Sequence, residues 1–186
     1  MVALAPLFQV VALDLRGYNL SDKPLGRDHY SMHHLVEDVQ AVIHHLKRDK
    51  AIIIGHGCGG VIAWIFAIGL PALTERLIIL NCPHPTGITP ELTRNPQQAE
   101  QSAYARDFQQ DGAHKRLAPE SLSAWIKDST ARERYIEAFR RSDFEAMLHY
   151  SNETTRLIRK CVCLSKFRRL SYRFTACKTS FCCQAR

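Results

Sequence analysis

The sequence Ala51-Ile-Ile-Ile-Gly-His-Gly-Cys-Gly-Gly60 begins the part of the chain that indicates its fold. Residues 51–54 are apolar and predict a buried strand, the glycines predict a tight turn, and the apolar residues 61–68 predict a helix that ends at Gly69. A strained turn from a strand into a helix needs small residues two positions before and two positions after its exposed central residue. Gly55 and Gly59 meet this requirement around Gly57, so the sequence predicts such a turn here.

The flanking sequence predicts further strands and a helix. Residues 8–13 and 77–80 are short apolar runs that predict two more buried strands. Between the first two predicted strands, Ser31 is placed to cap a helix whose apolar residues recur every three or four positions up to Leu46. Strands that alternate with helices in short steps predict the α/β fold class, with a parallel sheet and with any chemistry at the carboxyl ends of its strands.

The glycine turn can also be compared with two nucleotide-binding motifs. A phosphate-binding P-loop is excluded, because Val61 and Ile62 follow the last glycine where Lys and Ser or Thr would be needed. Gly55, Gly57 and Gly60 do match the spacing of a dinucleotide fingerprint. The acidic residue expected at the end of the next strand is missing, because Asn81 ends that strand. A dinucleotide site therefore remains only as an alternative, and no cofactor is expected.

The chain has the length of one domain, and its charge is distributed unevenly. The 186 residues suit one domain with a short appendage, and 46% hydrophobic with 23% charged residues excludes a fully disordered chain, collagen and a simple coiled coil. The net charge of +7 is concentrated near the end: residues 156–186 hold nine Lys or Arg and no Asp or Glu, against 16 basic and 18 acidic residues before them. Five of the seven cysteines lie in the same region, at positions 161, 163, 177, 182 and 183.

No membrane span or metal site is expected. No apolar run reaches the ~18 residues that a span needs, and the apolar beginning of the chain lacks a basic start and continues into Asp14. We therefore expect a cytoplasmic location with free thiols. The cysteine spacing of the tail does not match paired zinc motifs, and the adjacent histidines of the pairs His33-His34 and His44-His45 do not share a helix face, which favours a solvated helix over a metal site.

Three segments, in this order, resemble the epoxide-hydrolase branch of the α/β-hydrolase fold. They are Asp14-Leu-Arg-Gly-Tyr-Asn-Leu-Ser-Asp-Lys-Pro24, the glycine turn followed by Ala63-Trp64, and Leu80-Asn-Cys-Pro-His-Pro85. The resemblance covers about residues 8–150. It implies a partial α/β-hydrolase parallel sheet with helices on both faces in residues 1–85, a helical cap segment in residues 86–150, and a basic, Cys-rich tail of unassigned fold in residues 151–186.

The resemblance also implies a reaction and the residues that perform it. In the family, an aspartate on the turn opens an epoxide and forms an ester, which a histidine-activated water then hydrolyses to a diol. The aspartate position falls on Gly57, which has no side chain, and the backbone oxyanion donor falls on Cys58. Of the two cap tyrosines that bind the epoxide oxygen, the first falls on Tyr104 and the second on Ser151. The residues expected to contact substrate, with a packing role as the alternative, are His56, Pro83 and His84.

These assignments predict an incomplete and catalytically impaired epoxide-hydrolase-like protein. The family's acid and base strands would lie beyond the region of resemblance, and the expected ligand is a small apolar epoxide. A non-catalytic module that binds a ligand or a protein is the alternative. Cys58 is a poor replacement nucleophile, because His56 would then occupy a position that needs a small residue. Nucleic-acid binding by residues 156–186 is not expected. An altered reading frame after about Ser151 is a further interpretation of the tail. The oligomeric state is not predicted.

Overall fold

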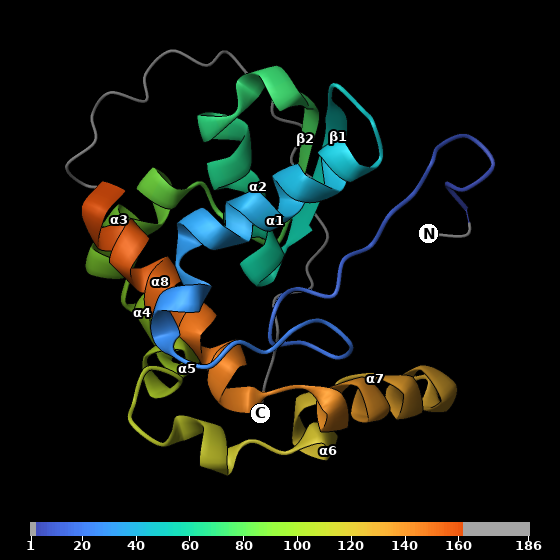
Figure 1. Cartoon of the computed structure of the whole chain (residues 1–186). Coiled ribbons are helices and arrows are strands. Elements are labelled where there is room, and N and C mark those ends of the chain that lie inside the picture. The colour runs from blue at the N-terminus through green and yellow to red at the C-terminus, as the bar shows by residue number, and fades with distance from the viewer. Residues whose placement is uncertain (1–2, 162–186) are drawn as a thin grey trace.

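The computed structural model of the protein describes residues 3–161 (Figure 1). The first part holds helix α1 (Met32–His45), strand β1 (Ala51–His56), helix α2 (Gly57–Gly69) and strand β2 (Thr74–Leu80). The helices that follow are α3 (Pro85–Arg94), α4 (Pro96–Gln101), α5 (Ala103–Asp107), α6 (Pro119–Leu122), α7 (Ser129–Arg141) and α8 (Phe144–Cys161). Short 3-10 helices are η1 (Arg27–Tyr30), η2 (Pro71–Leu73) and η3 (Ala113–Arg116).

The two strands form a parallel sheet. Ala51 is paired with Thr74 at one end of the register and His56 with Leu80 at the other. Helix α2 forms the crossover between the strands, and it ends at Gly69 before Pro71, as the sequence predicted. The predicted α/β fold class with a parallel sheet is therefore confirmed.

The two faces of this sheet differ in exposure. Helix α2 packs against both strands on one face, where Gly55 is buried. On the opposite face, Ile54, Ile78 and Leu80 keep 52%, 44% and 42% of their surface exposed. The alternation along β1 and β2 follows from strand geometry, in which successive side chains point to opposite faces.

The strand predicted for residues 8–13 is wrong. This segment forms no strand, because no backbone hydrogen bond within residues 3–161 pairs it with β1 or β2. It is not buried either, since Phe8, Val11 and Leu13 are 51%, 48% and 39% exposed. An apolar sequence becomes a strand only where a neighbouring strand supplies the ladder of hydrogen bonds.

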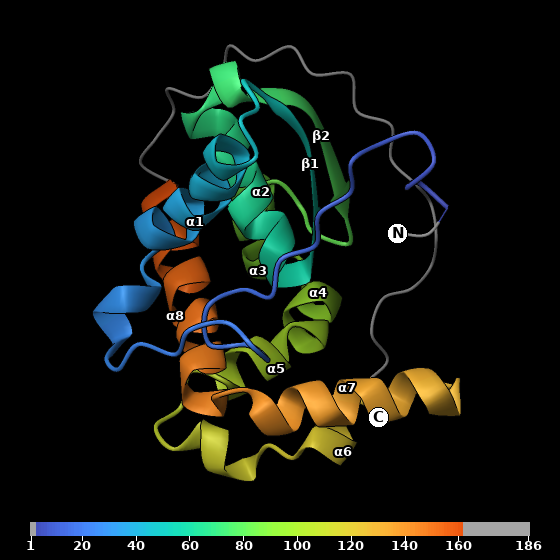
Figure 2. The same ribbon diagram turned by 45° about the vertical axis from the view of Figure 1, so that its right-hand side comes forward.

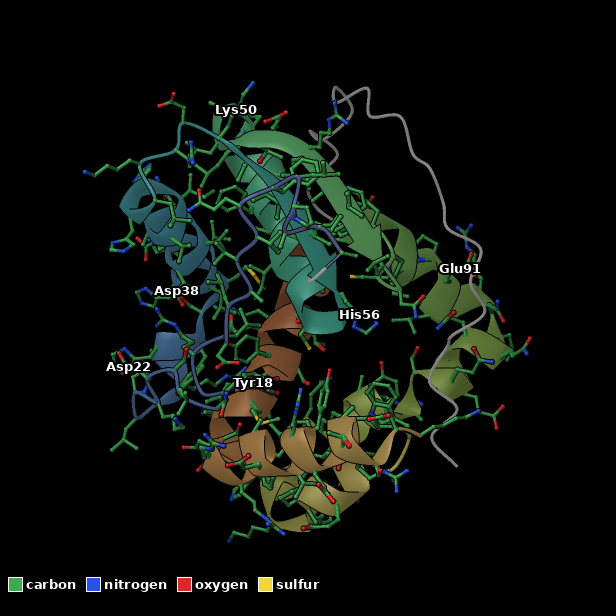
Figure 3. The ribbon with its side chains drawn as sticks, turned by 90° about the vertical axis from the view of Figure 1, so that its right-hand side faces the viewer. Tyr18, Asp22, Asp38, Lys50, His56 and Glu91 are labelled. Carbon is green, nitrogen blue, oxygen red and sulfur yellow. The ribbon has the colours of Figure 1, made fainter. Side chains whose placement is uncertain are left out.

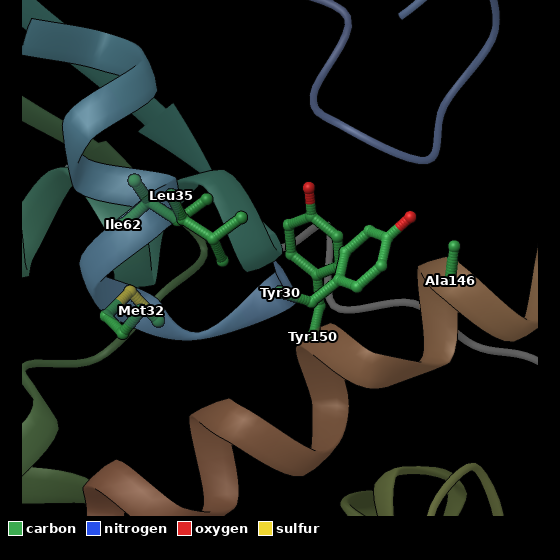
Figure 4. Close-up of a cluster of buried hydrophobic side chains, with 6 residues drawn as sticks. All are labelled: Tyr30, Met32, Leu35, Ile62, Ala146 and Tyr150. Carbon is green, nitrogen blue, oxygen red and sulfur yellow. The ribbon is translucent and has the colours of Figure 1, made fainter. Parts of the chain in front are cut away.

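A buried cluster joins the first part of the chain to its last helix (Figure 4). Tyr30, Leu35, Ile62 and Tyr150 are each 1% or 2% exposed and come from η1, α1, α2 and α8. Met32 and Ala146 complete the cluster. Ser31 is the N-cap residue of α1, as predicted, but its side chain makes no capping hydrogen bond.

The helices α3 to α8 form what we call the helical segment, residues 85–161. Figures 1 and 2 show α8 crossing beside α1 and α2, with α6 and α7 at the end of the molecule opposite the sheet. Helix α8 continues without a break through residue 151, at which the predicted tail begins. The rest of the predicted tail, from residue 162, lies outside the described residues. Within residues 3–161, no helix is long and apolar enough to cross a membrane.

Candidate functional site

The candidate site is centred on residues 55–60, which we call the elbow. Strand β1 ends at His56 and helix α2 begins at the next residue, Gly57. Gly57 has a φ of +53°, in the left-handed region that glycine adopts most easily. The structure therefore has the sharp strand-to-helix turn that the sequence predicted.

Two glycines make this close approach of strand and helix possible. A Cβ on Gly55 would lie 2.4 Å from the carbonyl oxygen of Gly59 and 2.7 Å from the Cβ of Ala63. A Cβ on Gly60 would lie 2.6 Å from the Cβ of Cys82. A Cβ on Gly59 would meet nothing within 4 Å, so the second position that must stay small is Gly60 and not Gly59.

Gly57 itself faces open space. A Cβ at this position would meet no atom within 4 Å. The position that the resemblance assigns to the nucleophile therefore has room for a side chain, and the sequence supplies none.

Gly57 is flanked by His56, the last residue of β1, and by Cys58, in the first turn of α2. Both residues are exposed. Although Cys58 keeps accessible surface, burial of its sulfur by surrounding atoms raises the pKa of its thiol. Burial, and then the charge of Cys58, raise the pKa of the Cys82 thiol to about 11. Both cysteines are thus mainly neutral thiols at pH 7, which makes them weak nucleophiles.

The loop after β2 brings His84 to the same end of the sheet. Its Nδ1 accepts a hydrogen bond from the backbone N–H of Thr86 at 3.3 Å, and this bond caps helix α3. The same Nδ1 lies 2.8 Å from the Thr86 hydroxyl. Its ring contacts the buried Trp64 edge to face, with centroids 4.7 Å apart. Burial lowers the pKa of His84. With Nδ1 accepting, the neutral ring carries its proton on Nε2, so His84 can donate to a ligand but is poorly placed as a base. Pro83, before it, is exposed.

The two predicted tyrosine positions lie in different surroundings. Tyr104, in α5, is 58% exposed and has a ring contact with Phe108 at 5.8 Å. Ser151 is half-buried in α8. Its neighbour Tyr150 is buried and donates a hydrogen bond of 2.7 Å to the backbone oxygen of Arg16.

The loop that begins at Asp14 is fixed by ionic and backbone contacts. The guanidinium of Arg16 donates to both carboxylate oxygens of Asp38, at 2.7 and 2.6 Å. Gly17, with a φ of +86°, lets this loop approach α8, because a Cβ there would lie 2.9 Å from the Cβ of Ala146. This approach brings Tyr18 against Tyr150, with ring centroids 5.5 Å apart.

The structure thus brings together the elbow and the loop that carries Pro83 and His84, and it places Tyr18 in contact with the neighbour of Ser151. The sequence predicted no role for Tyr18, although its position in a polar turn after an apolar segment was a usable signal. Within residues 3–161, no group of three or more His, Cys, Asp or Glu side chains is arranged to hold a metal ion.

Comparison with known proteins identifies the fold family. The alpha/beta hydrolase fold family matches residues 1–143 of this chain. The chain belongs to the α/β-hydrolase family.

Within the α/β-hydrolases, the similarities are to epoxide hydrolases. Epoxide hydrolase 4 of Homo sapiens is 41% identical over 102 residues, which cover 55% of this chain and 28% of that protein. The AB hydrolase superfamily protein YfhM of Bacillus subtilis is 42% identical over 102 residues, which cover 55% of this chain and 36% of that protein. A crystal structure of the Bacillus megaterium epoxide hydrolase with an inhibitor has a TM-score of 0.76 at 30% identity and covers 82% of this chain and 58% of that one.

These similarities confirm the resemblance to the epoxide-hydrolase branch of the α/β-hydrolases. The chain spans less than half of the length of the curated relatives that it matches, from 26% to 40% for those most similar to it.

Proposed function

We propose that this chain is an epoxide-hydrolase-like α/β-hydrolase that binds a small apolar epoxide at the elbow without hydrolysing it. One observation carries this proposal. The elbow has the positive φ and the open space of a nucleophile position, and the residue there is Gly57, which has no reactive atom.

No neighbouring side chain is suited to replace the missing nucleophile. Cys58 is adjacent, but burial raises the pKa of its thiol and leaves little thiolate at neutral pH. His84 is engaged through Nδ1 with Thr86. The reaction class of the family needs a carboxylate that forms an ester, so a chain with Gly57 lacks the first step.

Purified protein incubated with styrene oxide tests this proposal. The wild-type chain should form no diol above the uncatalysed background and no ester at residue 57. In Gly57→Asp, one carboxylate oxygen bonds to an epoxide carbon, the ring C–O bond breaks, and the ring oxygen takes a proton from a phenol or from water. The mass of this variant should increase by one whole epoxide, with the label on residue 57 in peptide mapping.

Gly57→Asn is the matched control, because an amide of the same shape is not a nucleophile. It should acquire no label at residue 57, and labelling of Cys58 or Cys82 would be recognised by the same peptide map. Diol formation by the wild-type chain would contradict the proposal.

A further inference from the structure

Tyr18 contacts the helix that carries one of the two substituted positions of the site. Its ring packs edge-on against Tyr150, with an interplanar angle of 83°. Tyr150 precedes Ser151, the position at which the resemblance expected a second tyrosine. A phenol from the loop after Gly17 therefore contacts the helix in which Ser151 stands at the expected tyrosine position.

The same side chain also lies close to the elbow. Tyr18 packs against the buried cluster that includes Ile62 of α2. Burial, and then the nearby thiol of Cys58, the residue after Gly57, raise the pKa of its phenol. Figure 3 shows Tyr18 and His56, from separate elements, at the same end of α2. Tyr18 is therefore positioned between the elbow and α8.

The backbone around Tyr18 is held in place from both sides. The N–H of Gly17 donates to the oxygen of Asp22 at 2.8 Å, and the N–H of Ser21 donates to the oxygen of Tyr18 at 2.9 Å. The N–H of Asn19 donates to Oγ of Ser142, in the helical segment, at 2.8 Å. These bonds fix the point from which the phenol projects.

The hydroxyl of Tyr18 is available as a donor. Within residues 3–161 no hydrogen bond of this hydroxyl is found, whereas the hydroxyl of Tyr150 donates to the backbone oxygen of Arg16. Burial raises the pKa of Tyr18, so the phenol keeps its proton throughout the neutral pH range. A half-buried, protonated phenol without a protein partner suits a ligand oxygen.

We propose that Tyr18 is a ligand-binding residue of this site and donates its phenolic hydrogen to the acceptor oxygen of an apolar ligand held at the elbow. The ligand class is a small hydrocarbon with one ether-type oxygen, such as an aryl epoxide. Tyr18 thereby supplies a phenolic hydrogen bond to the ligand, whereas position 151, where the resemblance expected a tyrosine, is a serine. This inference rests on the proposed function, because it names the donor of the same ligand site.

The test compares two probes of nearly equal shape, styrene oxide and cyclopropylbenzene, in which a CH₂ group replaces the oxygen. Affinities are measured by calorimetry on the full chain, on Tyr18→Phe and on the control Tyr135→Phe. The wild type and the control should prefer styrene oxide about three- to tenfold, the value of one neutral hydrogen bond. Tyr18→Phe keeps the ring that packs on Tyr150, and it should lose this preference while binding cyclopropylbenzene unchanged.

The other outcomes separate the two proposals. If Tyr18→Phe binds styrene oxide as well as the wild type does, the role of Tyr18 is wrong and ligand binding by the chain stands. If the wild type binds the two probes equally, no donor contacts the oxygen, which also overturns the role of Tyr18. If the folded wild type binds neither probe, the proposed ligand site itself fails.

Discussion

At the scale of single residues, the elbow contains glycines of two kinds. Gly55 and Gly60 are constrained by atoms that a Cβ would strike, whereas Gly57 and Gly59 face open space. The distinction separates glycines that the packing of strand and helix requires from glycines that it merely tolerates.

Gly55→Ala should therefore destabilise the protein, and Gly59→Ala should not. The new methyl group at Gly55 would meet a backbone oxygen, which cannot move aside as a flexible side chain can, so we expect a loss of about 3 kcal/mol in the free energy of unfolding. Alanine at Gly59, inside α2, should be neutral or add up to about 1 kcal/mol. Urea unfolding measures both changes, and equal destabilisation by the two variants would contradict this account.

Burial of two histidines makes stability depend on pH. Burial lowers the pKa of His84 and of His149, so the folded state favours their neutral forms. The unfolded chain binds these protons first, near pH 6.5. Stability should therefore fall as the pH drops below about 6.5, until the folded-state pKa values are passed.

His84→Asn checks the contribution of that residue. Asparagine can still cap α3, but it does not titrate. Unfolding free energies at pH 7.5 and pH 5.5 should differ less in His84→Asn than in the wild type, while the exposed variant His44→Asn should keep the wild-type difference. An unchanged pH dependence in His84→Asn would show that His84 does not contribute.

At the scale of elements, helices α7 and α1 differ in how their first turns are held. The carboxylate of Asp128 accepts the N–H of Ala131 at 2.7 Å and caps α7. Ser31 occupies the same position on α1, but its side chain makes no such bond. The residue type alone predicted the cap position on α1, but it did not predict the hydrogen bond.

Asp128→Ala should cost about 1 kcal/mol of unfolding free energy, because a helix N–H loses its acceptor. Ser31→Ala should change stability by less than about 0.5 kcal/mol. Thermal unfolding of the two variants provides the comparison. A larger loss at Ser31 than at Asp128 would mean that the cap of α1 forms in solution and that of α7 does not.

The elements that the sequence predicted correctly are those with local signals. The elbow, α2 and β1 follow from glycine spacing and apolar runs that lie within twenty residues of one another. Residues 8–13 have an equally apolar sequence, but a strand also needs a partner, and no local pattern supplies that information. The hydrogen bond from Tyr150 to Arg16 spans 134 positions of the chain, so it too could not be read from spacing.

At the scale of the whole molecule, two parts of the surface carry several exposed apolar side chains each. They are the sheet face opposite α2 and the segment before Asp14. These residues are Leu4, Leu7, Phe8, Val11, Leu13, Ile54, Ile78 and Leu80. Surface of this kind favours association.

Ile54→Thr combined with Ile78→Thr should therefore reduce self-association of the purified chain and its binding of a hydrophobic dye. Threonine keeps the β-branched shape that strands favour, so stability should change by less than about 1 kcal/mol. Ile62→Thr is the buried counterpart, 2% exposed, and should cost about 2–4 kcal/mol. Sedimentation velocity measures the self-association, and dye fluorescence measures the exposed apolar surface. Undiminished association of the double variant would contradict the prediction.

The backbone at Gly57 has a consequence for how this protein can change over time. A residue with a side chain would have to hold a φ of +53° at a cost of roughly 1–3 kcal/mol, whereas glycine adopts it freely. A reactive residue here therefore provides activity but lowers the stability of the fold, whereas glycine restores the stability and removes the activity. Wherever turnover is not under selection, mutation toward glycine at this position increases the fraction of folded chains, and the turn is retained after its chemistry is lost.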